Sequence, residues 1–93
     1  MALAIVTLKI MPESPETDLD ALQSIVEEKI DAFAGETAEK RVLVEPVAFG
    51  LKSLKITFVM EEKIGSTEPL ENAIGELESV NSVEVIDVRR AVG

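Results

Sequence analysis

The side chains of this chain that could do chemistry are carboxylates, lysines and arginines, because histidine and cysteine are both absent. Their absence removes the commonest general base near neutral pH and the thiolate nucleophile. Adjacent carboxylates such as Glu61 and Glu62 could serve as an acid–base pair, but such pairs arise by chance in a chain with 18 acidic residues. No glycine-rich phosphate loop and no metal-ligand spacing accompanies them. The residues therefore predict no catalytic group, no cofactor site and no metal site.

Two adjacent bases, Arg89 and Arg90, stand near the end of this acidic chain. Arginine binds phosphate and carboxylate groups through two parallel hydrogen bonds, so the pair could act at an anionic site. In isolation, a solubilising role or ion pairing with neighbouring acids explains them better. Both interpretations stay open at this point.

The charge balance limits the partners of the chain. Nine basic residues against 18 acidic ones in 93 residues give a formal net charge of -9. Nucleic-acid binding draws on neutralised phosphates, so this balance argues against it and suits a soluble protein or a partner with basic patches. The apolar start of the chain lacks the basic residues and the cleavage site of a signal peptide. No apolar run approaches the roughly 18 residues of a membrane span, and we expect a cytoplasmic protein.

Hydrophobic periodicity predicts the order β-α-β-β-α-β. Alternating apolar residues indicate strands over 3–10, 40–47, 51–60 and 80–91, and apolar residues spaced by three and four indicate helices over 18–34 and 68–79. The apolar phase of the last strand shifts between Val85 and Ile86, which predicts either a bulge or burial on both faces of the strand. The order is typical of a ferredoxin-like α+β fold, with a four-stranded antiparallel sheet and both helices on one face.

The open face of that sheet is predicted to lack aromatic side chains. RNA-binding domains of this architecture stack bases on aromatic residues of the central strands. The corresponding positions here are Thr7, Lys9, Ser53, Lys55 and Thr57. We therefore expect this face to be solvated or to join two copies of the chain, and not to bind RNA.

The turn between the second and third predicted strands carries Phe49, one of three phenylalanines in a chain without Trp or Tyr. A two-residue turn would place both central residues at positive φ, which is unfavourable for Phe. We therefore expect a three-residue loop with Gly50 in the left-handed region and Phe49 at ordinary backbone angles. Pro46 lacks an N–H and should either loosen the strand ladder or lie at a sheet edge. Phe49 either folds back onto the sheet, which residue preferences favour, or is exposed as an anchor for a partner.

At this hairpin the sequence resembles a known family. The stretch "EPVAFGLKSLKITFVMEEKIGSTEPLENAI" is similar to the beta-subunit family of translation elongation factor 1, most closely its short archaeal form. The family pattern is Pro-Val-x-aromatic-Gly-[Ile/Leu]-Lys-x-Leu, and it is matched by Pro46, Val47, Phe49, Gly50, Leu51, Lys52 and Leu54. The resemblance covers the whole chain and implies a single exchange domain over residues 1–93.

The resemblance implies a guanine nucleotide exchange factor for the GTPase elongation factor 1-alpha, which is not an enzyme in the chemical sense. The hairpin aromatic would dock on the second domain of the GTPase, and the end near the C-terminus would act at the magnesium and phosphate site of the first. The partner-binding residues are then Pro46, Phe49, Gly50, Lys52, Arg89 and Arg90. The eukaryotic family has a lysine just before its C-terminus, whereas this chain has no lysine after Lys63.

A different class of function remains as the alternative. Ferredoxin-like domains also serve as small-molecule-binding regulatory domains, usually as dimers through the sheet. Such a domain would be a stable dimer whose thermal stability rises with amino acids or nucleotides. An exchange factor predicts a monomer without that response.

Overall fold

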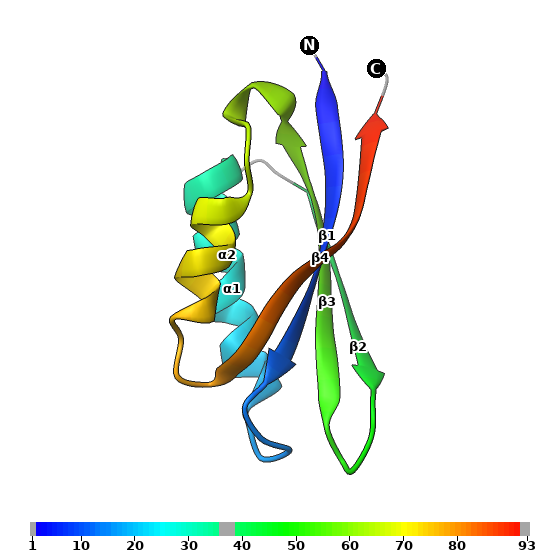
Figure 1. Ribbon diagram of the computed structural model, residues 1–93, viewed down its shortest axis with the longest axis vertical. Helices are drawn as coiled ribbons and strands as arrows, with labels where there is room; N and C mark the ends of the chain where they lie inside the picture. The colour runs from blue at the N-terminus through cyan, green and yellow to red at the C-terminus, as the bar shows by residue number, and fades with distance from the viewer. Residues whose placement is uncertain (1, 36–38, 92–93) are drawn as a thin grey trace.

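The computed structural model describes residues 2–35 and 39–91, and it has the predicted order of elements (Figure 1). The elements are β1 (Leu3–Pro12), α1 (Leu19–Ala34), β2 (Lys40–Pro46), β3 (Lys52–Glu61), the short 3-10 helix η1 (Glu62–Ile64), α2 (Glu68–Gly75) and β4 (Val80–Ala91). The predicted bounds hold to within two residues, except that α2 ends four residues earlier than expected. Among the described residues no helix is long and apolar enough to span a membrane.

The four strands form one antiparallel sheet in the order β2-β3-β1-β4. β1 and β3 lie in the centre, and β2 and β4 form the two edges. Two helices and one antiparallel sheet in the order βαββαβ constitute the ferredoxin-like α+β fold, so the predicted fold class is confirmed.

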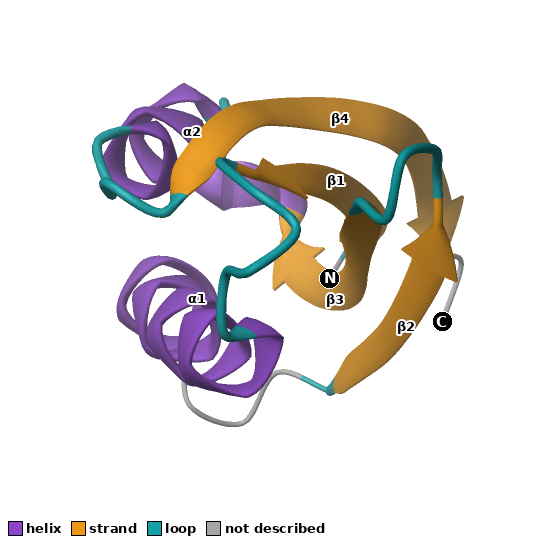
Figure 2. Ribbon diagram, turned by 90° about the horizontal axis from the view of Figure 1, so that it is seen from below, coloured by secondary structure: helices purple, strands orange, loops and turns teal. Residues whose placement is uncertain are grey.

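The core lies between the sheet and the two helices, which cover one face of the sheet (Figure 2). Along β1, and along β3 from Leu54 onward, every second side chain is buried because successive side chains of a strand point to opposite faces. The helices contribute apolar residues at spacings of three and four. The fully buried apolar side chains are Val6, Leu8, Ile10, Leu22, Val26, Ile30, Leu54, Ile56, Phe58 and Ile74, and Ser53 on β3 is a buried polar residue.

The ends of α1 are set by local side-chain chemistry. The Asp18 carboxylate accepts hydrogen bonds from the backbone N–H groups of Asp20 and Ala21, at 3.1 and 3.2 Å. Asp18 is therefore the N-cap, and not Thr17, whose hydroxyl instead accepts a hydrogen bond from the Ser14 N–H. At the other end Gly35 (φ 103°) terminates the helix in a conformation that favours glycine.

The bulge predicted in the last strand is confirmed. Thr7 lies opposite Asp87, whereas the next residue, Leu8, lies opposite Val85, so Ile86 is the extra residue of β4. The extra residue shifts the alternation of side chains by one position. Residues after Ile86 therefore lie on the face opposite to the one that they would occupy in a regular strand. Beyond the bulge Val88 and Arg90 lie on the helix-covered face, opposite Val6 and Ala4.

Candidate interaction sites at the two ends of the sheet

Phe49 lies at the tip of the β2–β3 hairpin with 97% of its surface exposed. Of the two interpretations left open by the sequence, folding back onto the sheet is therefore wrong. The other two phenylalanines behave differently: Phe58 is fully buried and Phe33 packs partly against the core. In this structure Phe49 contributes almost no buried surface to the fold, so its aromatic ring is free to contact another molecule.

The backbone of the tip corrects a second expectation. Leu51 N–H donates to the Ala48 carbonyl at 2.9 Å, and Val47 N–H donates to the Leu51 carbonyl at 2.9 Å. Ala48 to Leu51 therefore form a tight turn, in which both central residues have positive φ: 52° for Phe49 and 80° for Gly50. The prediction of ordinary angles at Phe49 was wrong.

The twist of the two strands explains this turn. Turns with positive φ at both central residues match the right-handed twist of the flanking strands, and turns of opposite hand would splay them. Gly50 adopts its angles at little cost, but Phe49 is the only non-glycine residue with positive φ in the described part of the chain. A bulky residue held in this region costs about 1–3 kcal/mol. The tip therefore combines strain with full exposure, a combination that stability alone does not favour.

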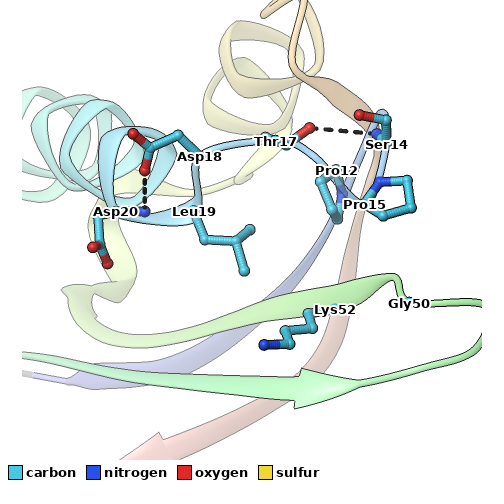
Figure 3. A pocket seen from close by; sticks show the side chains of 9 residues that line it. All are labelled: Pro12, Ser14, Pro15, Thr17, Asp18, Leu19, Asp20, Gly50 and Lys52. Atoms are coloured by element: carbon cyan, nitrogen blue, oxygen red, sulfur yellow. Dashed lines mark hydrogen bonds between the residues drawn. The ribbon is translucent and has the colours of Figure 1, made fainter.

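The loop between β1 and α1 lies beside the hairpin tip. A Cβ built on Gly50 would come 3.7 Å from the Pro15 Cβ, so this loop runs along the base of the turn. Between them is an open groove of about 300 Å³ (Figure 3), lined by Pro12, Ser14, Pro15, Thr17, Asp18, Leu19, Asp20, Gly50 and Lys52. The tip is thus one part of a wider surface with both acidic and basic side chains.

Pro46 and Lys52 form the last residue pair of the hairpin ladder before the turn. Val47 donates its N–H toward β3, and N–H groups alternate in direction along a strand, so the nitrogen of Pro46 faces outward from the sheet. Its missing N–H therefore removes no bond to β3, and the prediction of an edge position is confirmed. Pro46, Phe49, Gly50 and Lys52 are all exposed and lie at one end of the molecule.

Arg89 and Arg90 lie at the opposite end, and each is paired with a carboxylate. Arg89 Nε donates to Asp87 Oδ2 at 2.9 Å on its own strand. Arg90 donates through Nε and Nη2 to Glu62 Oε1, at 3.0 and 2.9 Å, which joins β4 to η1. Both side chains remain more than 70% exposed. The ion-paired interpretation therefore holds for both.

The two arginines occupy different faces of the sheet. Arg90 lies opposite Ala4, which is buried under the helices, whereas Arg89 lies opposite Ile5 on the open face. On the helix-covered face a groove of about 350 Å³ adjoins the ion pair, lined by Ala4, Val6, Met60, Glu62, Gly65, Ser66, Thr67 and Val88. A single anionic site of a partner could meet only one of the two guanidinium groups directly.

The hairpin tip lies at one end of the longest dimension of the molecule, which measures 42 Å, and the start of β1 and the end of β4 lie at the other (Figure 1). The central strands β1 and β3 run between the two ends without interruption. Among the described residues no cluster of three or more acidic groups could hold a metal ion. Within residues 2–35 and 39–91 no aromatic side chain lies on the open face of the sheet, and there the Thr7 and Thr57 hydroxyls are hydrogen-bonded at 2.9 Å.

Two features of these sites were missed by the sequence analysis. The β1–α1 loop was not identified as part of a site, and Glu62 was interpreted only as part of a chance carboxylate pair. The predicted topology does indicate that the loop lies near the hairpin tip, because the end of β1 and the β2–β3 turn must lie at the same end of an antiparallel sheet. No sequence signal links Glu62 to Arg90, which are 28 residues apart.

Comparison with known proteins adds independent information. The EF-1 guanine nucleotide exchange domain family matches residues 5–91. The chain is 48% identical over 83 residues to the elongation factor 1-beta of Methanosphaera stadtmanae, covering 89% of this chain and 90% of that one. It is 42% identical over 90 residues to the elongation factor 1-beta of Methanobrevibacter smithii, covering 97% and 98%.

Solved structures share the fold alone. The de novo designed protein Foldit4 superposes with a TM-score of 0.65 at 17% identity, over 98% of each chain. At that identity the likeness says nothing about function.

Proposed function

Because the chain belongs to the EF-1 guanine nucleotide exchange domain family, we propose that it promotes the replacement of GDP by GTP on elongation factor 1-alpha. The names of its relatives point to translation elongation, and we expect it to act in the cytoplasm. The single observation that carries the docking mode is Phe49, which is 97% exposed on a strained turn.

We assign Phe49 the role of anchor. Aromatic side chains dominate binding energy where they enter a pocket on the partner and lose their water. Because Phe49 buries almost nothing within this domain, docking would gain its contacts without taking any from the core. The tight turn holds the ring on a hairpin of fixed geometry, so little conformational entropy is lost on binding. Pro46 and Gly50 shape this tip, and Lys52 places a positive charge at its rim.

At the opposite end we assign the contact with the nucleotide site to Arg90 rather than to Arg89. Arg90 is held by Glu62 from a second element, beside an apolar groove on the helix-covered face. Arg89 pairs only with Asp87 of its own strand and points to the other face. A guanidinium group that is hydrogen-bonded to one carboxylate can replace that carboxylate by another carboxylate or by a phosphate, because the hydrogen-bond geometry is similar. At the GTPase, Arg90 would compete for the groups that hold magnesium and phosphate.

The two contacts act through differential binding. An exchange factor accelerates nucleotide release when it binds the nucleotide-free GTPase more tightly than the nucleotide-bound form. By linkage, bound nucleotide lowers the affinity of the GTPase for the exchange factor to the same extent as the exchange factor lowers its affinity for the nucleotide. A sheet whose central strands span both ends can hold the anchor on one domain while the other end disturbs the nucleotide site. No covalent bond forms or breaks in this process.

The test is release of a fluorescent GDP analogue from elongation factor 1-alpha, followed with increasing amounts of this protein. We expect the release rate to rise and to saturate. A rate that stays at its basal value with the protein in large excess would overturn the proposed function. Bovine serum albumin at the same concentration controls for nonspecific effects.

A further inference from the structure

Strand β2 presents an apolar surface at the edge of the sheet. β2 is hydrogen-bonded to β3 on one side, and no strand of the described residues pairs with its other side (Figure 2). Leu43 is 55% exposed and Val44 is 41% exposed, on opposite faces of the strand. Exposed edge strands with apolar side chains readily accept another strand. Natural edges are protected by charge, proline or bulges. In β2 the charged residues and the proline lie only at the two ends of the strand, and they leave the apolar segment from Val42 to Val44 between them.

The backbone of β2 is also arranged to accept a strand. Because Val47 donates its N–H toward β3, the alternation of an antiparallel ladder turns the N–H and C=O groups of Val42 and Val44 outward. Leu43 and Glu45 direct theirs toward β3, as the contact of Ser53 Oγ with the Glu45 carbonyl at 3.5 Å also indicates. The outer edge thus offers unpaired donors and acceptors beside the exposed Val44 and the half-buried Val42.

The sequence of β2 is complementary to itself. It reads Lys-Arg-Val-Leu-Val-Glu-Pro, with bases before and an acid after an apolar centre. We propose that β2 pairs antiparallel with β2 of a second copy of this chain, with Leu43 on the two-fold axis. In that register Arg41 lies opposite Glu45 of the second copy, and Val42 lies opposite Val44. Every directly opposed pair is then either apolar or of opposite charge, except that Lys40 lies opposite Pro46.

The faces of the strand agree with this register. Arg41, Leu43 and Glu45 share the open face of the sheet, so the Leu43 pair is flanked by two Arg41–Glu45 pairs. Val42 and Val44 would exchange both of their outward hydrogen bonds across the interface. Within one copy Glu45 already contacts Lys55 at 2.5 Å, so Arg41 of the second copy would complete a three-charge network. Opposite charges directly across a strand pair stabilise it, and like charges destabilise it.

The other edge of the sheet is protected from such pairing. The bulge at Ile86 shifts the register of β4 and bends its outer edge, a device that opposes strand addition. The proposal is therefore specific to β2. It also differs from a dimer through the open face of the sheet, because β2 pairing would form one continuous sheet from the two copies.

Self-association of this kind is weak. Pairing engages one strand of seven residues. We expect the surface buried by such a pair to be smaller than the roughly 1,200 Å² of a standard stable interface. The net charge of -9 on each copy opposes it further. We therefore expect a monomer in dilute solution and a dimer only at high protein concentration. This refines the expectation of a monomer from the sequence.

Sedimentation equilibrium of the full chain tests the proposal up to roughly 1 mM protein. We expect the weight-average mass to rise from monomer toward dimer with concentration. The variant Leu43→Lys places like charges opposite each other on the axis, and its dissociation constant should rise by more than about tenfold. Val88→Lys is the matched control, since Val88 is an exposed aliphatic residue, 59% exposed, on the other edge strand. A wild-type monomer at every concentration, or equal effects of both variants, would overturn the proposal.

A mixing experiment tests the register itself. Arg41→Glu places two acids opposite each other, and Glu45→Arg places two bases opposite each other, so each variant alone should remain monomeric. An equimolar mixture of the two restores an acid opposite a base at both positions and should dimerise. A mixture that sediments as monomers would contradict the register. Thermal unfolding of each variant shows whether it is folded.

Hydrogen exchange of backbone amides provides a test that needs no variant. At high concentration the amides of Val42 and Val44 should gain protection, because they face the second copy. The amide of Leu43 faces β3 and should be protected at all concentrations. Protection of Val42 and Val44 that does not change with protein concentration would contradict the proposal.

Discussion

The two ends of the sheet use their side chains in opposite ways. At the hairpin end an aromatic ring stands in solvent on a strained turn. At the terminal end the two arginines are each held by a carboxylate of the same chain. A strained turn that carries an exposed aromatic ring adds nothing to the stability of the domain. At the terminal end, by contrast, the positive charge of each exposed guanidinium group is balanced by a neighbouring carboxylate. Under the proposed function, the exposed ring at the hairpin end would contribute binding energy once the GTPase docks, and the terminal end would exchange one ion pair for another.

The largest expected effect is at the hairpin. Phe49→Ala should raise the concentration of the protein that gives half-maximal nucleotide release by about 100-fold, because an aromatic anchor in a pocket contributes about 2–4 kcal/mol. The maximal release rate should change little. The free energy of unfolding should stay within about 0.5 kcal/mol of the wild type, since the ring is exposed. A large fall in melting temperature would mean that Phe49 supports the core, contrary to its exposure here.

The terminal end should show a smaller effect of a different kind. Arg90→Ala should lower the maximal release rate by about tenfold, which corresponds to about 1.4 kcal/mol, and leave the half-maximal concentration nearly unchanged. Arg89→Ala is the matched control, because it removes the same group from the neighbouring position on the other face. If Arg89→Ala has the larger effect, the assignment of the helix-covered face to the nucleotide site is wrong.

Relief of strain provides a third difference between the ends. Phe49→Asn creates an Asn-Gly turn, which tolerates positive φ at both positions, and should stabilise the domain by about 1 kcal/mol. Urea denaturation measures this change. The same variant should lose nucleotide release as Phe49→Ala does. An Asn variant that is no more stable than the wild type would show that the turn is not strained.

The smallest effect is expected at the rim of the hairpin. Lys52→Ala removes an exposed charge beside the groove and should slow association with the GTPase by about two- to fivefold, because rim charges act mainly on association rates. Stopped-flow kinetics at low and high salt would measure it. The difference from the wild type should shrink at high salt. A difference that persists there would mean that Lys52 makes a desolvated contact.

The fold could be predicted from the sequence because its signals are local. Alternation along residues 3–10 and 51–60 and the apolar stripe of α1 each define an element and the face that it buries. Even the bulge at Ile86 left a signal, since the apolar phase changes there. The sequence does not distinguish Thr17 from Asp18 as the N-cap of α1, because both residue types are good caps, and the hydrogen bonds alone identify Asp18.

The sites were less predictable because their features depend on tertiary geometry. Residue preferences correctly described Phe as unfavourable at positive φ, but the twist of the strands determined the turn. Whether Phe49 is exposed depends on which side chains reach it, and a single sequence does not contain that information. The sequence likewise placed Arg89 and Arg90 together, whereas the pleat of β4 separates them onto opposite faces.

The most direct test of the account is the affinity of this protein for elongation factor 1-alpha without nucleotide and with bound GDP, measured by isothermal titration calorimetry. Exchange by differential binding predicts that the nucleotide-free form is bound at least about tenfold more tightly. Phe49→Ala should weaken binding to both forms, and Arg90→Ala should reduce the ratio between them. Equal affinities of the wild-type protein for the two forms would contradict the account, however tightly the complex is bound.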